Sequence, residues 1–598
     1  MTKALRASCA SGMAAVLLLT LPFGASALAS GADTEFEALA QEYLADLPKF
    51  SPVNATQIGD HSADDKLDQV DARARTRART LYKGLLRKLS AIDRDALSRA
   101  NQVDAELLRN ELDHDVWAID TYEEWAWNPL FYVNLAGNSI YGLVARDFAP
   151  LDTRLDAVAA RLEQLPRFWR QARASIDPAR VPKIHAETAV KQNSGLNSII
   201  ETMIVPRMAE LSPATRQRLT AAIEVAKDAV ARQQTWLEDD LLPRAAGDFR
   251  IGAALFDAKL AFTLNSSLGR KEIRARAEAE YESVRNQMYE IAKKVYAAKN
   301  PYTTFPDTPD EAYKQVIIRS ALEQAYQALP PRDGIVEVAR QELKRASDFV
   351  VEHNIVTMPA EPVEIIVMPE FQRGVSVAYL DPPGPLDKGQ KAFYAVAPLP
   401  KDWTDEQVHS FLREYNLYSI RDLSIHEGVP GHYLQLSLSN RYPSALRSVL
   451  WSGPMVEGWA VYAERMMVDE GFGGDDPLQR LITLKWYLRG VTNAIIDSAI
   501  HVDGMTREQA MKLMIEGGFQ EEREAAGKWV RAQLTSTQLS TYFVGYQEHM
   551  ELRKAVQAAW GDEFTLRRYH DQALSYGSPP VRFIRALMLD EPIPHAGK

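Results

Sequence analysis

The segment Lys271–Lys299 reads KEIRARAEAEYESVRNQMYEIAKKVYAAK. Its apolar residues recur at three- and four-residue spacing among charged ones. That spacing is typical of a helix that buries one face against a core and leaves the other in water. The segment therefore predicts a long amphipathic α-helix, and its period is the main guide to the fold of the whole chain.

The same period recurs on both sides of this segment. Prolines at Asn300-Pro301 and Leu329–Pro331 interrupt it, and it resumes at Trp403–Glu406, where Thr404 is the expected N-cap. No fixed-period repeat is visible, which disfavours a solenoid. We expect a mainly α-helical protein forming one unit over residues 30–598. Five earlier segments carry the helical period: Phe36–Leu47, Asp71–Ile92, Gln102–Tyr122, Leu155–Ser175 and Pro213–Leu241.

One region has the two-residue alternation of β-strands instead. Val363–Val367, Val375–Tyr379 and Ala392–Val396 are strand candidates, and the turn-rich Asp381–Pro385 precedes the third of them. We expect a small antiparallel sheet here, beside the site described below.

The N-terminus resembles a secretory signal peptide covering residues 1–29. Lys3 and Arg6 precede an apolar run over Met13–Leu21, and Ala27–Ala29 supplies a small-x-small cleavage pattern. The run is short for a membrane span, although an uncleaved anchor is the alternative. We therefore expect an exported protein in the periplasm, with secretion into the medium as the alternative, and without stable membrane insertion after cleavage.

The composition of the chain restricts its possible partners and its possible metal ligands. A formal net charge of −11 over 598 residues disfavours nucleic acid as a partner, because such binding needs a basic face. The only cysteine, Cys9, precedes the apolar run, whereas a lipidated cysteine would follow it. A mature chain without cysteine has no thiolate ligand or cysteine nucleophile. A metal ion would therefore be held by His, Asp or Glu.

One motif has the residue types of a catalytic metal site: His426-Glu427-Gly428-Val429-Pro430-Gly431-His432. Zinc peptidases commonly place two histidines four residues apart on a helix, with a glutamate beside the first acting as base. Here the spacing is six, which turns the second imidazole about 120° away from the first on an ideal helix. The glycines and the proline between them are expected to break the helix and return His432 to His426. The alternative is two histidines capping a broken helix without a metal.

A third ligand is expected downstream. Glu457 and Glu464 lie seven residues apart, hence on one face of a helix that otherwise carries apolar residues such as Trp459 and Val461. Carboxylates on an apolar stripe are costly unless they are paired or bind a metal. We assign Glu457 as a ligand and Glu464 as the partner that orients a ligand histidine. A surface helix with two ordinary glutamates is the alternative.

These residues resemble the bacterial DUF885 family, which is grouped with gluzincin-type metallopeptidases. The resemblance rests on His426–Gln435 and Glu457–Glu464, with softer similarity at Asn128–Leu130 and Phe564–Asp571. It implies a large helical fold with a deep cleft, with the metal-site region at about 363–598.

More distantly, the chain resembles angiotensin-converting enzyme and thimet oligopeptidase, where a ligand glutamate follows the second histidine by about two dozen residues. Glu457 follows His432 by 25 residues. Dipeptidyl peptidase III, with one extra residue between its histidines, shows that a lengthened motif can still bind zinc. The Tyr-Phe-Val context of the converting enzyme is similar to Tyr542–Val544, which implies that Tyr542 stabilises the oxyanion, with Tyr546 as second candidate.

Two positions depart from the family pattern. Tyr433 stands where a further histidine is common, and Asn493 stands where an arginine is usual. The second departure removes the basis for transferring an ion pair to this position.

For the remaining candidate residues, a purely structural role is about as well supported as a role in the site. Asp497 and His501 lie four residues apart on the helical pattern Leu481–His501 and could support the site or simply pair. Tyr379 and Tyr394 could flank an extended substrate or pack across strands. His570-Asp571 and Tyr576–Ser578 could line the cleft or belong to C-terminal packing.

The parts together predict a Zn²⁺-dependent peptidase. His426, His432 and Glu457 would hold the ion, Glu427 would act as general base, and Tyr542 would stabilise the oxyanion. Short peptides are the expected substrates, cleaved by a carboxypeptidase or an oligopeptidase. A zinc hydrolase of a non-peptide amide or ester, and a non-catalytic exported binding protein, are the alternatives. The oligomeric state is left open.

Overall fold

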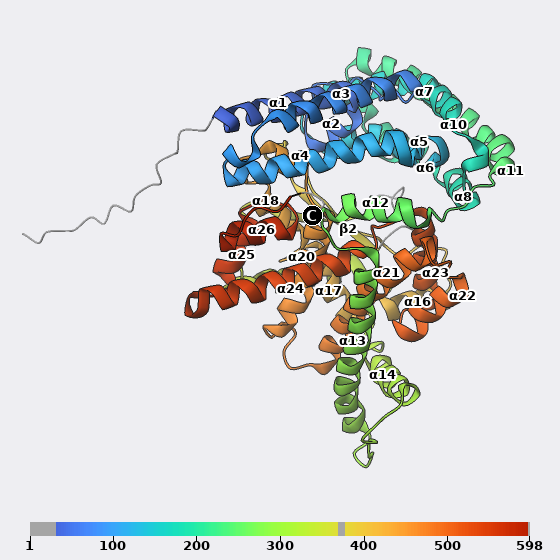
Figure 1. Ribbon diagram of the computed structural model, residues 1–598. Helices are drawn as coiled ribbons and strands as arrows, with labels where there is room; N and C mark the ends of the chain where they lie inside the picture. Colours follow the sequence, from blue (N-terminus) through green and yellow to red (C-terminus); the bar gives the residue numbers. More distant parts are fainter. Residues whose placement is uncertain (1–30, 369–376, 596–598) are drawn as a thin grey trace, which may run out of the picture.

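The computed structural model describes residues 31–368 and 377–595 (Figure 1). The expected signal peptide, residues 1–29, lies outside these ranges, as do Val375 and Ser376 of the second expected strand. Within them the chain is mainly α-helical, as its apolar period predicted.

The six helices predicted from periodicity are all present, with ends shifted by a few residues. Lys271–Lys299 forms α13 (Arg270–Lys299). Two of the predicted helices end in a π-helical turn, at Ala118–Tyr122 and Leu237–Leu241. The N-cap predicted at Thr404 is confirmed, because its hydroxyl accepts from the Gln407 N–H and the Gln407 side chain returns the bond.

The N-terminal helices form a layer of their own, coloured blue to teal in Figure 1. Their apolar faces meet in two cores, one that includes Phe168, Trp169 and Ile140 and another that includes Phe36, Leu85 and Leu108. The helices are α1 (Gly31–Phe50), α2 (Pro52–Ile58), α3 (Ala72–Ala91), α4 (Arg99–Trp117), α5 (Glu124–Trp127), α6 (Pro129–Val144), α7 (Leu151–Ser175), α8 (Lys183–Gln192), α9 (Gly195–Ile199), α10 (Pro213–Trp236) and α11 (Leu242–Arg244).

The remaining helices surround a larger core that includes Trp459, Leu488 and Phe543. Figure 1 shows α13 and α14 extending away from the N-terminal layer. These helices are α12 (Gly252–Leu264), α13, α14 (Glu311–Ala325), α15 (Ile335–Glu352), α16 (Asp405–Glu414), α17 (Leu417–Glu427), α18 (His432–Ser439), α19 (Ala445–Val449), α20 (Gly453–Asp469), α21 (Pro477–His501), α22 (Arg507–Lys512), α23 (Glu522–Leu534), α24 (Ser540–Trp560), α25 (Leu566–Leu574) and α26 (Val581–Leu589).

The three strands form a sheet of order β1-β3-β2. They are β1 (Val363–Val367), β2 (Ala378–Asp381) and β3 (Ala392–Val396). β2 pairs antiparallel with β3, but β1 pairs parallel with β3, so the expectation of a wholly antiparallel sheet is wrong. The connection from β1 to β3 passes through β2 and is long enough for the crossover that parallel strands require.

Polar contacts join the N-terminal layer to the rest. The buried Arg447 donates to Asp104 at 2.5 Å and to the Ala100 carbonyl at 2.8 Å. Tyr141 donates to Asp381, the last residue of β2, at 2.8 Å. These bonds fix α4 and α6 against the part of the molecule that holds the metal motif.

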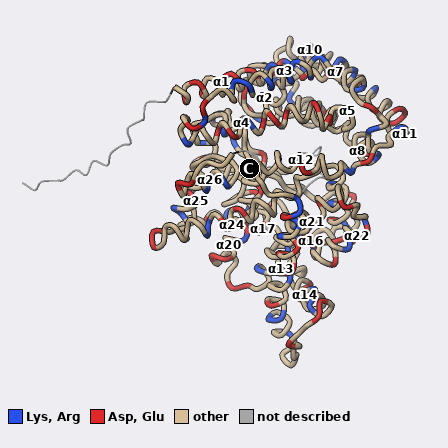
Figure 2. Tube along the Cα trace, in the orientation of Figure 1, with Lys and Arg blue, Asp and Glu red and all other residues tan. Residues whose placement is uncertain are grey.

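Charged residues of both signs are interspersed along the chain (Figure 2). None of the described helices combines the length and the apolar character that crossing a bilayer requires.

Candidate metal centre

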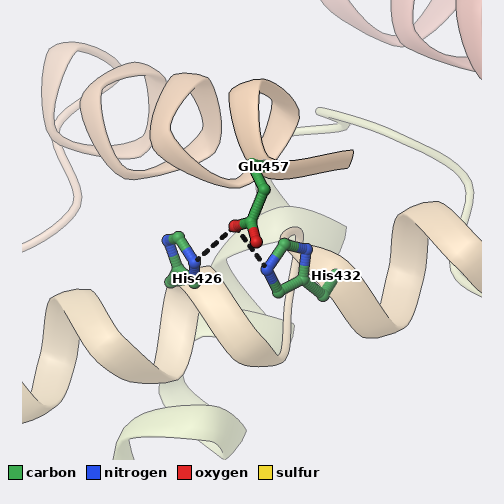
Figure 3. Close-up of side chains that lie close together, drawn as sticks. All are labelled: His426, His432 and Glu457. Atoms are coloured by element: carbon green, nitrogen blue, oxygen red, sulfur yellow. Dashed lines mark ion pairs between the residues drawn. The ribbon is translucent and has the colours of Figure 1, made fainter. Parts of the chain in front are cut away.

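His426, His432 and Glu457 point at one another from α17, α18 and α20 (Figure 3). Glu457 Oε2 lies 3.9 Å from His426 Nε2 and 3.5 Å from His432 Nε2. One donor atom from each residue lies within 4.8 Å of the others. A tetrahedral zinc ion with bonds of 2.0–2.2 Å needs donors about 3.4 Å apart. The residues present therefore fit a zinc ion with small side-chain adjustments.

A turn between two helices brings the histidines together. α17 ends at Glu427, and the N–H of Gly431 donates to the carbonyl of Ile425 at 2.9 Å before α18 begins at His432. The imidazole centroids are consequently 4.6 Å apart, with the rings nearly perpendicular. The expected interruption of the helix is present and has the expected consequence for His432.

Helix α20 holds this turn as well as supplying a donor. The indole N–H of Trp459 donates to the carbonyl of Pro430 at 2.8 Å, and the side chain is fully buried. Because Trp459 lies two residues after Glu457, one helix fixes both the carboxylate and the loop that carries His432. Gly458 lets α20 approach α24 closely, since a Cβ there would lie 2.2 Å from the backbone of Gly545.

Gly431 is the position in the turn least able to accept a side chain. A Cβ there would lie 2.0 Å from the carbonyl oxygen of His426 and 2.2 Å from that of Ile425. We expect Gly431→Ala to lower the free energy of unfolding by about 1–3 kcal/mol, because the backbone must move. Gly527→Ala is the matched control, since nothing lies within 4 Å of its added Cβ in helix α23. It is expected to change stability by no more than about 1 kcal/mol, in the stabilising direction. Urea unfolding compares the two, and equal midpoints would contradict the crowding at Gly431.

Glu464 lies behind His426, as predicted for an orienting partner. Its Oε1 is 2.6 Å from His426 Nδ1. A proton on Nδ1 shared with Glu464 leaves the lone pair of the imidazole on Nε2, the atom that faces Glu457. The Nδ1 of His432, in contrast, has no hydrogen-bond partner in the described part of the chain.

The protonation states suit metal binding at His426. Burial and the neighbouring His432 lower the pKa of His426 to about 4, so this imidazole is neutral at neutral pH. Burial opposes protonation of His432 as well, but the hydrogen bond with Glu457 and the charges of Glu457, Glu427 and Glu464 together raise its pKa. A cation bound between His432 and Glu457 would displace any proton that the two residues share.

Glu427 lies beside both imidazoles. Its carboxylate acts on the pKa of each, and its Oε2 accepts a hydrogen bond of 2.9 Å from the backbone N–H of Leu380 in β2. The strand therefore holds the side chain in position at the end of α17.

Tyr542 lies near Glu457, whose charge contributes to raising the pKa of its buried hydroxyl. The hydroxyl oxygen accepts from Arg531 at 3.0 Å and from Gln538 at 3.3 Å. Because both partners are donors, the phenolic proton stays available for another acceptor. Tyr546 instead packs its ring against Tyr487, with centroids 4.3 Å apart, and is not brought to the triad.

Asp497 and His501 do not contact the triad directly. Asp497 accepts from the N–H groups of Thr537 and Ser540 and thereby fixes the start of α24, the helix that carries Tyr542. His501 Nε2 lies 2.8 Å from the carbonyl of Ala532 in α23. Both residues therefore position α23 and α24 and do not form a hydrogen-bonded pair with each other.

The weaker candidates are mostly packing residues. Tyr394 is fully buried, 3.4 Å from the Ser424 hydroxyl, and Tyr379 lies toward Tyr141 and Asp381. His570 is fully buried between the Tyr462 hydroxyl and the Ile355 carbonyl, each at 2.8 Å.

The C-terminal loop and Tyr433 also have structural partners, whereas the buried Oδ1 of Asn493 has none in the described part of the chain. Asp571 accepts from Thr357, and Ser578 accepts from Gln435. Tyr433 donates to the Glu361 carbonyl. Asn493 is buried in α21.

Three basic residues near the triad were missed from the sequence: Arg489 in α21, and Lys528 and Arg531 in α23. Arg489 acts on the pKa of His426 and Glu464, and Arg531 on that of Glu457. The available signal was the placement of Lys528 on the apolar face of its helix, four residues before Ala532 and three after Ala525.

The triad is open to solvent, but the deep cleft stays a prediction. The Glu457 side chain is 23% exposed, against 11% for that of His432. Surface hollows of about 390 and 340 Å³ lie at Leu86–Ala91 and around Glu548 and Arg582, and none of the triad residues lines either of them.

Comparisons with known proteins agree with this fold. The family model described as "Bacterial protein of unknown function (DUF885)" matches residues 52–588. A solved structure described as a "putative lipoprotein of unknown function" from Shewanella oneidensis is 35% identical, with a TM-score of 0.78, over 93% of this chain and 99% of that one. The crystal structure of a "putative lipoprotein" from Colwellia psychrerythraea is 17% identical, with a TM-score of 0.74, over 94% and 99% of the chains, and shows the fold alone. No curated protein matches the chain significantly.

Proposed function

The chain belongs to the DUF885 family, bacterial proteins of unknown function, and we propose from its site that it is a zinc-dependent peptidase acting on short peptides. The observation that carries the proposal is the convergence of two imidazoles and one carboxylate within 4.8 Å, with Glu427 beside them. Zinc sites with three protein ligands and an adjacent glutamate are typical of hydrolases.

A zinc ion bound by the triad would supply Lewis acidity and lower the pKa of a coordinated water toward about 7. His426, His432 and Glu457 would hold the ion, and Glu464 fixes the tautomer of His426. Glu427 accepts a proton from the attacking water and later transfers it to the leaving amine. Its bond from Leu380 keeps one oxygen occupied and leaves the other for this transfer.

Tyr542 donates its phenolic proton to the oxygen that becomes negative as the peptide carbonyl is attacked. Arg531 and Gln538 orient the hydroxyl by donating to its oxygen. The raised pKa of Tyr542 keeps the hydroxyl protonated at neutral pH, so that it can act as a donor.

We also propose that the protein is exported and works in the periplasm. The signal-peptide pattern of residues 1–29 supports export, and both solved relatives are described as "putative lipoprotein".

The test of the proposed function is metal analysis of the purified mature chain beside peptide hydrolysis. We expect about one equivalent of zinc per chain, hydrolysis of short peptides, and loss of activity with a chelator that added zinc restores. An ester and a non-peptide amide assayed in parallel separate peptidase from other hydrolase activity. Chelator-insensitive activity together with absence of stoichiometric zinc would defeat the proposal.

A further inference from the structure

Three basic side chains lie together beside the candidate metal centre, on two adjacent helices. Lys528 and Arg531 are three residues apart and therefore share a face of α23, and Arg489 faces them from α21. Arg489 donates to Glu524, which lies one turn before Lys528 on α23, and this contact brings the three charges close together.

Of the three, Lys528 has the fewest polar contacts with the described residues. It is 6% exposed and forms no hydrogen bond or ion pair with any residue in 31–368 or 377–595. Burial and the two neighbouring guanidinium groups lower its pKa well below the usual value. Three positive charges held close together in a largely buried place repel one another, so their retention indicates an anionic ligand that offsets the repulsion.

The two arginines can also donate further hydrogen bonds. Arg489 donates through Nη2 to Glu524, but its buried Nη1 has no hydrogen-bond partner within the described ranges. Glu524 also accepts from Tyr415 at 3.2 Å, so it is already shared. Arg531 uses Nη2 for Tyr542 and Gln538. A guanidinium group suits a carboxylate because its N–H groups match the two oxygens.

We propose that Arg489, Lys528 and Arg531 form a binding site for the free C-terminal carboxylate of a short peptide. The position of the site determines which peptide bond would be cleaved, because Arg531 donates to Tyr542, the proposed oxyanion donor. A carboxylate held there lies within one or two residues of the cleaved bond, since a residue spans at most about 3.6 Å. The protein would then act as a carboxypeptidase, releasing one or two residues from the C-terminus. This inference rests on the proposed peptidase function and names its substrate class.

The first test compares three short peptides on the zinc-loaded protein. Two share one sequence and end in a free C-terminal carboxylate or in an amide, and the third differs in its last residue, which is a glutamate with an amidated C-terminus. We expect kcat/KM to be about 10- to 100-fold higher for the free carboxylate than for either amide, the effect of a charge-assisted contact. Equal rates for all three would overturn the carboxylate site while leaving the peptidase proposal intact. A fast glutamyl amide would instead assign the site to an acidic side chain and overturn the C-terminal form.

Variants show whether these residues cause the preference. Lys528→Met is expected to lower the ratio of kcat/KM for the free carboxylate over the amide from about 10- to 100-fold to nearly one. It is also expected to raise Tm, because a positive charge beside two guanidinium groups is replaced by an apolar chain of similar length. Arg523→Gln, on the exposed side of the same helix over Trp403, is the matched control and keeps the full preference. A Lys528→Met protein that is folded and keeps the preference would overturn the assignment.

A binding measurement tests the carboxylate site independently of peptide hydrolysis. N-acetyl-dialanine and its amide are titrated into zinc-loaded Glu427→Gln by calorimetry. We expect the carboxylate to bind about 10- to 100-fold more tightly than the amide, and Lys528→Met in the same background to remove the difference. If no peptide is hydrolysed, the peptidase proposal fails, and this titration still decides the carboxylate site. Equal affinity for acid and amide would refute it.

Discussion

Replacing Glu427 by Gln is expected to lower kcat for a short peptide by about 10²- to 10⁴-fold, the usual contribution of a general acid–base group. The amide keeps the shape of the side chain and an oxygen that can accept the hydrogen bond from Leu380. It has no basicity, so it cannot take a proton from water. Zinc content should stay at one equivalent, because Glu427 is not among the three donors that converge. Kinetics and metal analysis of the same preparation check both expectations.

Glu364→Gln serves as the matched control for this substitution. Glu364 lies on β1 with a side chain 51% exposed and forms a surface ion pair with Lys391. The same chemical change there should leave kcat unchanged. If Glu427→Gln kept more than half of the normal activity while holding zinc, the assignment of Glu427 as the base would be wrong.

His432→Ala is expected to abolish stoichiometric zinc binding and with it the peptidase activity. The imidazole supplies one of three donors, and the two that remain, on α17 and α20, would hold the ion far more weakly. In the unmodified chain, zinc at about 1,000 times its dissociation constant should stabilise the fold by about 4 kcal/mol. His432→Ala should lose this increment even if the metal-free protein also changes in stability. Thermal unfolding with and without zinc measures the increment directly.

An exposed histidine provides the comparison for this second experiment. His353 follows α15 and stacks on Phe349, 3.8 Å between centroids, away from the triad. His353→Ala should keep both the zinc equivalent and the thermal increment. A His432→Ala protein that binds zinc as the parent does would remove His432 from the metal site.

The helical part of the fold could be predicted because the required information is local. Each helix buries one face, so the three- and four-residue period of a segment such as Lys271–Lys299 is visible without its partners. The strands were also located by their alternation. Their pairing was not, because alternation defines which side of a strand is apolar and not which strand lies beside it. Hence the parallel pairing of β1 with β3 needed the structure.

The basic cluster was missed for a related reason. Arg489 and Lys528 are 39 residues apart in the sequence, and each is an ordinary charged residue in a helix when considered alone. Whether they form a binding site depends on their burial and on the residues that face them. Both arise from the packing of α21 on α23.

The sequence by itself determined the kinds of donor available: two imidazoles, three carboxylates nearby, and no thiolate in a mature chain. It also determined that the helix must break between His426 and His432, because glycine and proline have strong local preferences. Only the tertiary structure decided that the break turns His432 back toward His426, through the bond from Trp459 to Pro430 and the tight fit of Gly431. The direction of a chain after such a turn is set by contacts with distant helices, and those contacts are not encoded in any local period.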